Sequence, residues 1–230
     1  NGQVTRGEVY RSEAVGYLRE GRRVWCDVTI YPVCDDHGNL LNTVSVMIDV
    51  THSRMPEILR HKMLEAMVQE ESIESLMGLV CKEVQRVAPE VVASILSVDD
   101  SGRLRTLAAP DLPASYCAAL DNVAIGPGVG SCGAAAFSGT AVMVRDIASH
   151  PFWVRFRDLA LPLGLRACWS TPIKSSSGRV LGTFAFYYHE PREPSLLHQQ
   201  LVSASIYLCA LALEREESRA HIRQLAFYDD

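Results

Sequence analysis

The chain has 230 residues, of which 48% are hydrophobic and 21% are charged, a composition typical of soluble globular proteins. A formal net charge of −5, without a cluster of lysine or arginine, argues against nucleic-acid binding, and no uncharged apolar run reaches the length of a membrane span. The N-terminus has neither the layout of a signal peptide nor an initiator methionine. We therefore expect a cytoplasmic fragment of a longer protein, without a membrane or nucleic-acid partner.

Residues 1–51 alternate between apolar and polar side chains, which predicts strands. The alternation is clearest over 24–31 and 44–50, and an earlier strand is expected at about 9–18. The cluster 35–39, with two aspartates and a glycine, marks the turn between the last two strands. The sequence therefore predicts three consecutive antiparallel strands.

After residue 51 the apolar period changes to that of a helix. One helix is expected over 52–70, with Pro56 tolerated in its first turn, and a second amphipathic helix over 73–87 that ends before Pro89. The remaining elements are predicted in this order: strand 91–98, return strand 104–109, short helix 113–120, strand 141–144, strand 165–173, strand 180–188 and a helix over 195–228.

Two segments stand out in the middle of the chain. The first is a glycine-rich loop, 126–133, that leads into a run of small residues compatible with a helix. The second is 165–173, where a strand carries Cys168, Trp169 and Ser170 side by side. Between them, a loop places His150 beside Pro151.

These segments resemble a known family. The strings GVGSCGxAA, VxDIxxHPxW, LRACWSxPI and GxVLGTFAxYY are similar to those of GAF domains of bacterial sensor proteins, over roughly residues 70–213. The resemblance implies a cytosolic module that senses a small molecule. It also implies an α+β fold with a central antiparallel sheet flanked by helices. The ligand or cofactor stays unidentified at this point.

The first strands resemble the C-terminal half of a PAS domain. The frame is Trp25, Pro32-Val33, Gly38 and Asp49-Val50-Thr51. The N-terminal half, which normally supplies most of a PAS pocket, is missing, so we do not expect a PAS cofactor here.

The final residues, 225–230, resemble the connector that enters a GGDEF domain. A layout of PAS, GAF and GGDEF, commonly followed by EAL, is that of cyclic di-GMP signalling proteins and is similar to the oxygen-sensing phosphodiesterase family. The resemblance implies half a PAS domain (1–51), a linker helix (52–70), a GAF domain (71–213) and a signalling helix with connector (214–230). The longer protein would be a diguanylate cyclase, a cyclic di-GMP phosphodiesterase or both, whereas no catalytic constellation is expected in this fragment.

The candidate ligand-binding residues are Ser131, Cys132, His150, Trp153, Cys168, Trp169 and Ser170. Each has a plainer interpretation. Cys132 stands where a helix should begin, which lowers a thiol pKa, but a small buried residue is the alternative. Cys168 fits a core strand, and a loop histidine such as His150 more often makes a hydrogen bond than binds haem or a metal. The other histidines are expected to be solvated: His37, His52, His61, His189, His198 and His221.

Seven scattered cysteines form no CxxC pair, and no histidine lies at zinc-finger spacing from them, so no metal site is predicted. Free methionine-sulfoxide reductases also use a GAF fold with a cysteine at the position of Cys132. Their further catalytic cysteines fall where this chain has 150–153, so that activity is not expected.

Three functions stay open from the sequence: a small-molecule sensor controlling a downstream cyclic di-GMP enzyme, a thiol- or haem-based redox or gas sensor, and a ligand-free dimerisation platform. The last helix bears on the third. Its residues Leu197, Leu201, Ala204, Leu208 and Leu211 follow coiled-coil spacing, and Ile222 and Leu225 stay in phase. We expect a homodimer built from the helices 52–88 and 195–228.

Overall fold

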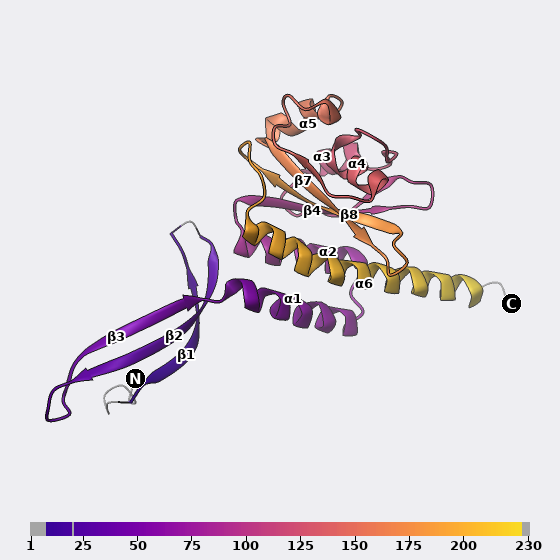
Figure 1. Cartoon of the computed structure of the whole chain (residues 1–230). Helices are drawn as coiled ribbons and strands as arrows, with labels where there is room; N and C mark the ends of the chain where they lie inside the picture. The colour runs from indigo at the N-terminus through magenta and orange to yellow at the C-terminus, as the bar shows by residue number, and fades with distance from the viewer. Residues whose placement is uncertain (1–7, 20, 227–230) are drawn as a thin grey trace. The chain divides into compact units, whose positions relative to one another are not determined.

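Figure 1 shows the computed structural model, which describes residues 8–19 and 21–226. The connector residues 227–230 lie outside the described residues, as do the side chains of His52, His221 and 223–226. Chain contacts divide the molecule into two compact units, residues 1–57 and 58–230.

The first unit contains a three-stranded antiparallel sheet in the order β1-β2-β3. The strands are β1 (Tyr10–Tyr17), β2 (Arg23–Cys34) and β3 (Leu40–Asp49). They form where the alternating pattern predicts them. The turn between β2 and β3 is closed by Asp35, whose carboxylate accepts hydrogen bonds from the backbone of His37 and from the backbone and side chain of Asn39.

The segment Asp49-Val50-Thr51 fixes the exit from this sheet. The Asp49 carboxylate accepts the Thr51 backbone N–H at 2.9 Å, and the Thr51 hydroxyl oxygen accepts the Trp25 backbone N–H at 2.9 Å. The Val50 N–H donates to the Trp25 carbonyl at 2.8 Å. These bonds hold the end of β3 against β2, and helix α1 (Thr51–Val68) begins at Thr51.

The second unit is built on a five-stranded sheet in the order β5-β4-β8-β7-β6, in which every neighbouring pair is antiparallel. Its strands are β4 (Val91–Val98), β5 (Leu104–Ala108), β6 (Val142–Val144), β7 (Ala167–Lys174) and β8 (Val180–Tyr188). The predicted central antiparallel sheet is confirmed. Gly182 lies in β8 at its centre, where an added Cβ would stand 2.2 Å from the Leu96 carbonyl oxygen.

Helices α2 (Ile73–Val87) and α6 (Leu196–Ala226) cover one face of this sheet (Figure 1). The second half of α1 joins them through polar contacts. The buried Glu83 carboxylate on α2 accepts from Lys62 Nζ of α1 at 2.7 Å and from Arg86, and Arg215 of α6 donates to the Met67 carbonyl at 3.1 Å. Three helices are thus tied together on this side of the sheet.

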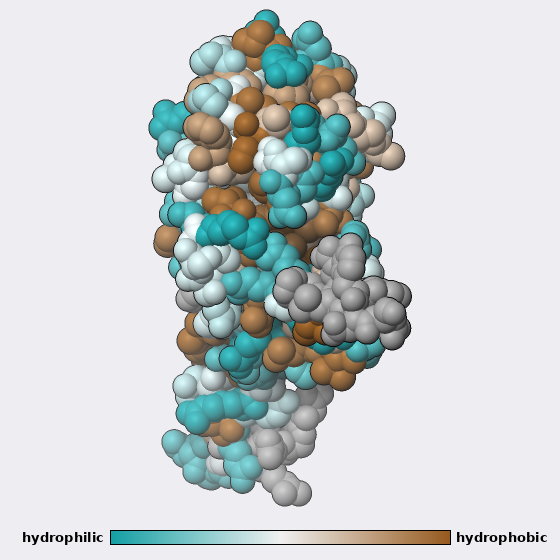
Figure 2. Space-filling view, turned by 90° about the vertical axis from the view of Figure 1, so that its right-hand side faces the viewer, coloured by the Kyte–Doolittle hydropathy of each residue, from teal (hydrophilic) through white to brown (hydrophobic). Residues whose placement is uncertain are grey.

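The opposite face is covered by short elements and loops (Figure 1). They are α3 (Ala114–Leu120), α4 (Gly130–Ser138), the 3-10 turn η2 (Pro151–Trp153), α5 (Arg157–Ala160) and the 3-10 turn η3 (Leu161–Leu163). Figure 2 shows, on the face it views, that hydrophilic side chains divide the hydrophobic surface into separate patches.

Helix α6 modifies two sequence predictions. Leu201 and Leu208 are buried in the domain itself, so these two positions of the predicted coiled-coil seam are explained by packing on the chain's own core. By length and composition alone, Leu196–Ala220 of α6 could also cross a membrane, which we did not foresee. Half of that stretch is buried inside the protein, and the core helix of a soluble protein passes the same test.

The prediction that His198 is solvated is wrong, because its ring is completely buried. Ser195 Oγ accepts the His198 backbone N–H at 3.3 Å, and His198 Nδ1 accepts the Ser195 N–H at 3.2 Å. This is a capping box at the start of α6 in which histidine replaces the usual Glu or Gln. Since Nδ1 accepts a hydrogen bond, the neutral ring carries its hydrogen on Nε2. The Nε2–H donates to the Glu90 carboxylate at 2.9 Å.

His198 makes the stability of this unit depend on pH. Burial lowers its pKa below 6.5, the Arg192 charge acts in the same direction, and the bond to Glu90 opposes both. The unfolded chain therefore binds the proton first, so this contribution is complete above pH 6.5 and is lost as pH falls below it. In His198→Gln the cap is kept without a titrating group.

We expect the wild-type protein to lose stability relative to His198→Gln between about pH 7.5 and about pH 5.5 in urea unfolding followed by circular dichroism. If the difference in the free energy of unfolding between the two proteins were the same at both pH values, this assignment would be wrong.

Candidate functional site

Helix α4 lies directly on the sheet because its first seven residues are small. The segment Gly130–Ala136 is buried throughout, and it packs on β7 and β8. Gly128 (φ +79°) and Gly130 (φ +56°) take left-handed conformations in the approach to the helix, where other residues would be strained. The glycine-rich loop therefore delivers a helix whose backbone lies close to the strands.

A chain of hydrogen bonds connects three segments at the start of α4. Trp153 Nε1–H of η2 donates to Ser131 Oγ at 3.1 Å, and the Ser131 hydroxyl donates to the Cys168 carbonyl of β7 at 3.4 Å. All three residues are buried. The indole of the loop, the first turn of α4 and the start of β7 are thereby held together.

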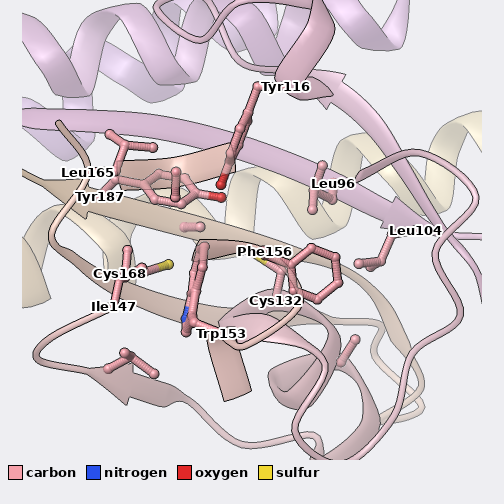
Figure 3. Packing of buried hydrophobic residues seen from close by; sticks show 14 residues of the cluster. Leu96, Leu104, Tyr116, Cys132, Ile147, Trp153, Phe156, Leu165, Cys168 and Tyr187 are labelled. Carbon is pink, nitrogen blue, oxygen red and sulfur yellow. The ribbon is translucent and has the colours of Figure 1, made fainter. Parts of the chain in front are cut away.

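Two thiols lie beside this chain. Cys132 is in the first turn of α4 and Cys168 is in β7, and both belong to the same buried cluster (Figure 3). The Cys168 thiol and the hydroxyls of Ser170, Thr183 and Tyr187 that surround the sulfur lower the pKa of Cys132 to about 7, because they stabilise its thiolate, although burial opposes them. Burial raises the pKa of Cys168. The pair therefore combines one acidic thiol with one that stays protonated.

Two tyrosines close the cluster on the side of α3. Tyr116 meets Tyr187 edge to face at 6.2 Å between ring centroids, and their hydroxyl groups point toward each other in Figure 3. Burial raises the pKa of both phenols. Both tyrosines are therefore neutral and can act as hydrogen-bond donors at physiological pH.

The cluster encloses a small cavity between α4, β4, β8 and the loop that carries η2. Its free volume is about 20 Å³, which is room for about one water molecule. Its lining residues include Leu96, Val129, Ser131, Cys132, Trp153, Phe156 and Tyr187. Because Trp153 and Phe156 fill most of the space, a larger ligand could enter only if their loop moved.

The structure separates the predicted site residues into two groups. Ser131, Cys132 and Trp153 line the cavity. Cys168 is packed in the same buried cluster, and Ser170 faces it from β7 because it lies two residues further along the strand. That these residues bind a ligand stays a prediction.

Two predicted residues lie elsewhere. Trp169 points to the opposite face of the sheet, where it meets Phe186 edge to face at 6.0 Å, and Phe186 in turn meets His198 of α6. His150 caps η2: its Nδ1 accepts the Phe152 N–H at 3.2 Å, and its ring contacts that of Phe152. Neither residue lines the cavity. In the described part of the chain, no group of three or more His, Cys, Asp or Glu could hold a metal.

Sequence reasoning missed Tyr187, Tyr116 and Phe156. Tyr187 could have been found, since Thr183, Ala185 and Tyr187 alternate with Phe184 and Phe186 along β8 and so face α4. No periodic signal marks Tyr116 or Phe156, whose positions depend on tertiary packing.

A family model of the GAF domain matches residues 70–214 of this sequence. The chain belongs to the GAF domain family. The five-stranded antiparallel sheet with helices on both faces is therefore that of a GAF domain.

Two curated relatives are named as sensors. The methyl sulfide methyltransferase-associated sensor of Methanosarcina acetivorans is 27% identical over 194 residues, which is 83% of this chain and 19% of that protein. The oxygen sensor protein DosP of Escherichia coli is 26% identical over 211 residues, which is 92% of this chain and 20% of that protein. The chain thus spans about a fifth of the length of these relatives, and their names support a sensory role for its domain.

Solved structures show the same fold. The GAF domain of a phosphoenolpyruvate-protein phosphotransferase from Coxiella burnetii has a TM-score of 0.59 at 17% identity, covering 74% of this chain and 98% of that chain. The free methionine-R-sulfoxide reductase of Neisseria meningitidis has a TM-score of 0.54 at 17% identity, covering 74% and 92%. At this identity the likeness concerns the fold alone.

The bond between Trp153 and Ser131 can be tested by a double-mutant cycle. Ser131→Ala leaves the buried indole N–H without its acceptor, which should cost about 1–3 kcal/mol. In Trp153→Phe that donor is absent, so the double variant should be about 1 kcal/mol more stable than the sum of the single losses, measured by urea unfolding.

Trp169→Phe is the matched control for this cycle, because Trp169 lies on the other face of the sheet. Its effect and that of Ser131→Ala should add within about 0.5 kcal/mol. If Ser131→Ala showed the same coupling energy with both tryptophan variants, the hydrogen bond would not be the source of that coupling.

Proposed function

We propose that this chain is the sensory part of a signalling protein and that its GAF domain binds a small ligand between α4 and the loop carrying η2. The supporting observation is the cavity in front of Cys132, in which polar groups meet an otherwise apolar core. Three residues with polar side-chain groups, Ser131, Cys132 and Tyr187, line this space. Buried apolar walls with a few convergent polar groups are typical of small-molecule sites.

In this proposal, the site opens when the loop swings away. Trp153 and Phe156 occupy the space that a ligand larger than water would need, and they lie on one short segment. Opening would break the bond between Trp153 and Ser131 and release the first turn of α4. Ligand binding would thus exchange one packed arrangement for another.

We further propose that the signal leaves through α6 to a downstream domain that makes or degrades cyclic di-GMP. Support comes from the resemblance of the C-terminal residues to a GGDEF connector and from the packing of α6 on β7 and β8. Arg215 and Arg219 of α6 bond to Met67 and Glu70, so α6 is also coupled to the segment that follows α1.

The N-terminal unit fits the second half of a PAS domain, and we propose this identity for it. Its sheet carries three exposed apolar side chains on one face of β3, namely Val44, Val46 and Ile48. Apolar sheet residues normally have a covering layer, which the absent half of such a domain would supply.

The proposed homodimer keeps Leu211 and Ile222 of the predicted seam of α6 and replaces its buried positions with exposed neighbours. Leu196, Tyr207, Leu211 and Ile222 are exposed, with Tyr207 72% accessible, whereas Leu201 and Leu208 are buried. Tyr207, Leu211 and Ile222 lie at steps of four and eleven residues, which keeps them on one side of a helix. We propose that this stripe pairs with its copy in a two-fold dimer.

Ligand binding can be tested on the freshly purified chain by native mass spectrometry together with an absorption spectrum. We expect a small non-covalent ligand and no haem band, and we expect Phe156→Ala to change its retention because Phe156 lines the cavity. A haem band would favour the gas-sensor alternative, and a protein without ligand under all conditions would favour the dimerisation platform.

The dimer can be tested by light scattering at tens of micromolar. Tyr207→Asp places a charge in the exposed stripe and should shift the protein toward monomer without unfolding it. Asn122→Asp, an exposed change of the same charge on a loop outside α6, should leave the dimer intact. A wild-type monomer, or equal effects of the two substitutions, would refute this arrangement.

A further inference from the structure

Cys132 of α4 and Cys168 of β7 belong to one buried cluster, although they are 36 residues apart in sequence (Figure 3). The adjacent residue Ser131 hydrogen-bonds to the Cys168 carbonyl at 3.4 Å, so the first turn of α4 sits directly on this point of β7. The small residues of α4 permit the short backbone distance that a disulfide needs. Both thiols are free in this structure.

The surroundings of Cys132 favour its thiolate. The hydroxyls of Ser170 and Thr183 are buried and make no hydrogen bond of ordinary geometry within the described residues. Both offer donors to the Cys132 sulfur, as do Tyr187 and the Cys168 thiol. A neutral thiol is a poor hydrogen-bond acceptor, whereas a thiolate is a strong one. The unpaired hydroxyls of Ser170 and Thr183 are therefore explained if the Cys132 sulfur is ionised at least part of the time.

The cavity gives a small reactant access to this sulfur. Cys132 lines a space of about 20 Å³, next to the side chains of Trp153 and Phe156. Hydrogen peroxide is only slightly larger than the water molecule that fits there. Larger thiol oxidants, such as a peptide disulfide, do not fit.

The other face of the sheet provides an internal comparison. Cys81 of α2 and Cys209 of α6 are also buried and lie close to each other. Burial raises the pKa of both, to about 12 for Cys209, and no side-chain donor lowers it. Neither borders the cavity beside Cys132. Cys132 and Cys168 therefore have nearby donors and a cavity, whereas Cys81 and Cys209 have no such donors and do not border that cavity.

We propose that Cys132 and Cys168 form a peroxide-sensitive dithiol, in which Cys132 is oxidised first and Cys168 resolves it to a disulfide. The proposal deepens the proposed sensory function, on which it rests for its downstream effect, by naming hydrogen peroxide as the class of signal. Conversion of the pair would pull α4 toward β7 and disturb the bond between Ser131 and Trp153.

The chemistry balances with peroxide as the only co-reactant. The Cys132 thiolate attacks one peroxide oxygen, the O–O bond breaks, and the released hydroxide takes up the proton lost by the thiol to form water. The resulting sulfenic acid is then attacked by the Cys168 sulfur, the S–O bond breaks, and the hydroxide leaves with the Cys168 proton as a second water. Two thiols and one hydrogen peroxide thus give one disulfide and two waters.

The test is a titration of the whole chain with hydrogen peroxide, followed by alkylation and peptide mass mapping without reductant. We expect a cross-link between the peptides of Cys132 and Cys168, formed at least about tenfold faster than any oxidation of Cys81 or Cys209, because the reactive form is the thiolate. Trp153 fluorescence should change with the same time course and recover on reduction.

Single serine variants identify the order of events. Cys168→Ser should leave Cys132 as a sulfenic acid that dimedone traps, and Cys132→Ser should leave Cys168 reduced. Cys81→Ser and Cys209→Ser are the matched controls and should not alter the cross-link. Equal oxidation rates for the four buried cysteines, or a Cys132 that reacts without joining Cys168, would overturn the proposal.

This outcome is separable from that of the ligand experiment. If the protein carries no ligand but forms the cross-link, the dithiol proposal stands and the small-molecule ligand is refuted. If it carries a ligand but forms no cross-link, the ligand site stands and the dithiol proposal is refuted.

Discussion

The close approach of α4 to the sheet is the constraint on which the rest of this domain depends. A helix that covers a sheet usually presents large apolar side chains, but α4 presents glycine, serine, cysteine and alanine, all of them buried. Because its backbone lies close to β7 and β8, Ser131 can reach both a strand carbonyl and the indole of Trp153. The loop with η2 is positioned by that indole, so the geometry of the cavity follows from the size of the α4 side chains.

The core beneath α4 is more polar than stability alone requires. Ser94, Ser170 and Thr183 face α4 in adjacent strands, and their hydroxyls make no hydrogen bond within the described residues. Each such group costs about 1–3 kcal/mol relative to a satisfied one, and valine would fill the place of Thr183 without that cost. This polar centre lies next to a cavity and two thiols. A bound ligand or a new negative charge there would satisfy these hydroxyls and so stabilise the domain.

Much of the fold follows from local patterns, whereas the site follows only in part. The period-two and helical runs predicted the strands and helices, and motif resemblance placed Ser131, Cys132 and Trp153 together. Alternation along β7 should have excluded Trp169, because neighbours on a strand point to opposite faces. The serine three residues before His198 could have revealed the capping box. Phe156 has no such local signal, because its place in the cavity is set by contacts with segments distant in sequence.

Helix α6 shows how one surface pattern can support two interpretations. An a/d seam and a sheet-covering face both place apolar residues at steps of three and four, so the seam through Leu201 and Leu208 cannot be assigned from sequence. The structure assigns those residues to the domain's own core and leaves Tyr207, Leu211 and Ile222 outside. If that outer stripe pairs with a second copy, as proposed, each α6 has the sheet on one side and its partner on the other. If a change at α4 shifted β7, helix α6 would then transmit that shift directly to the partner subunit.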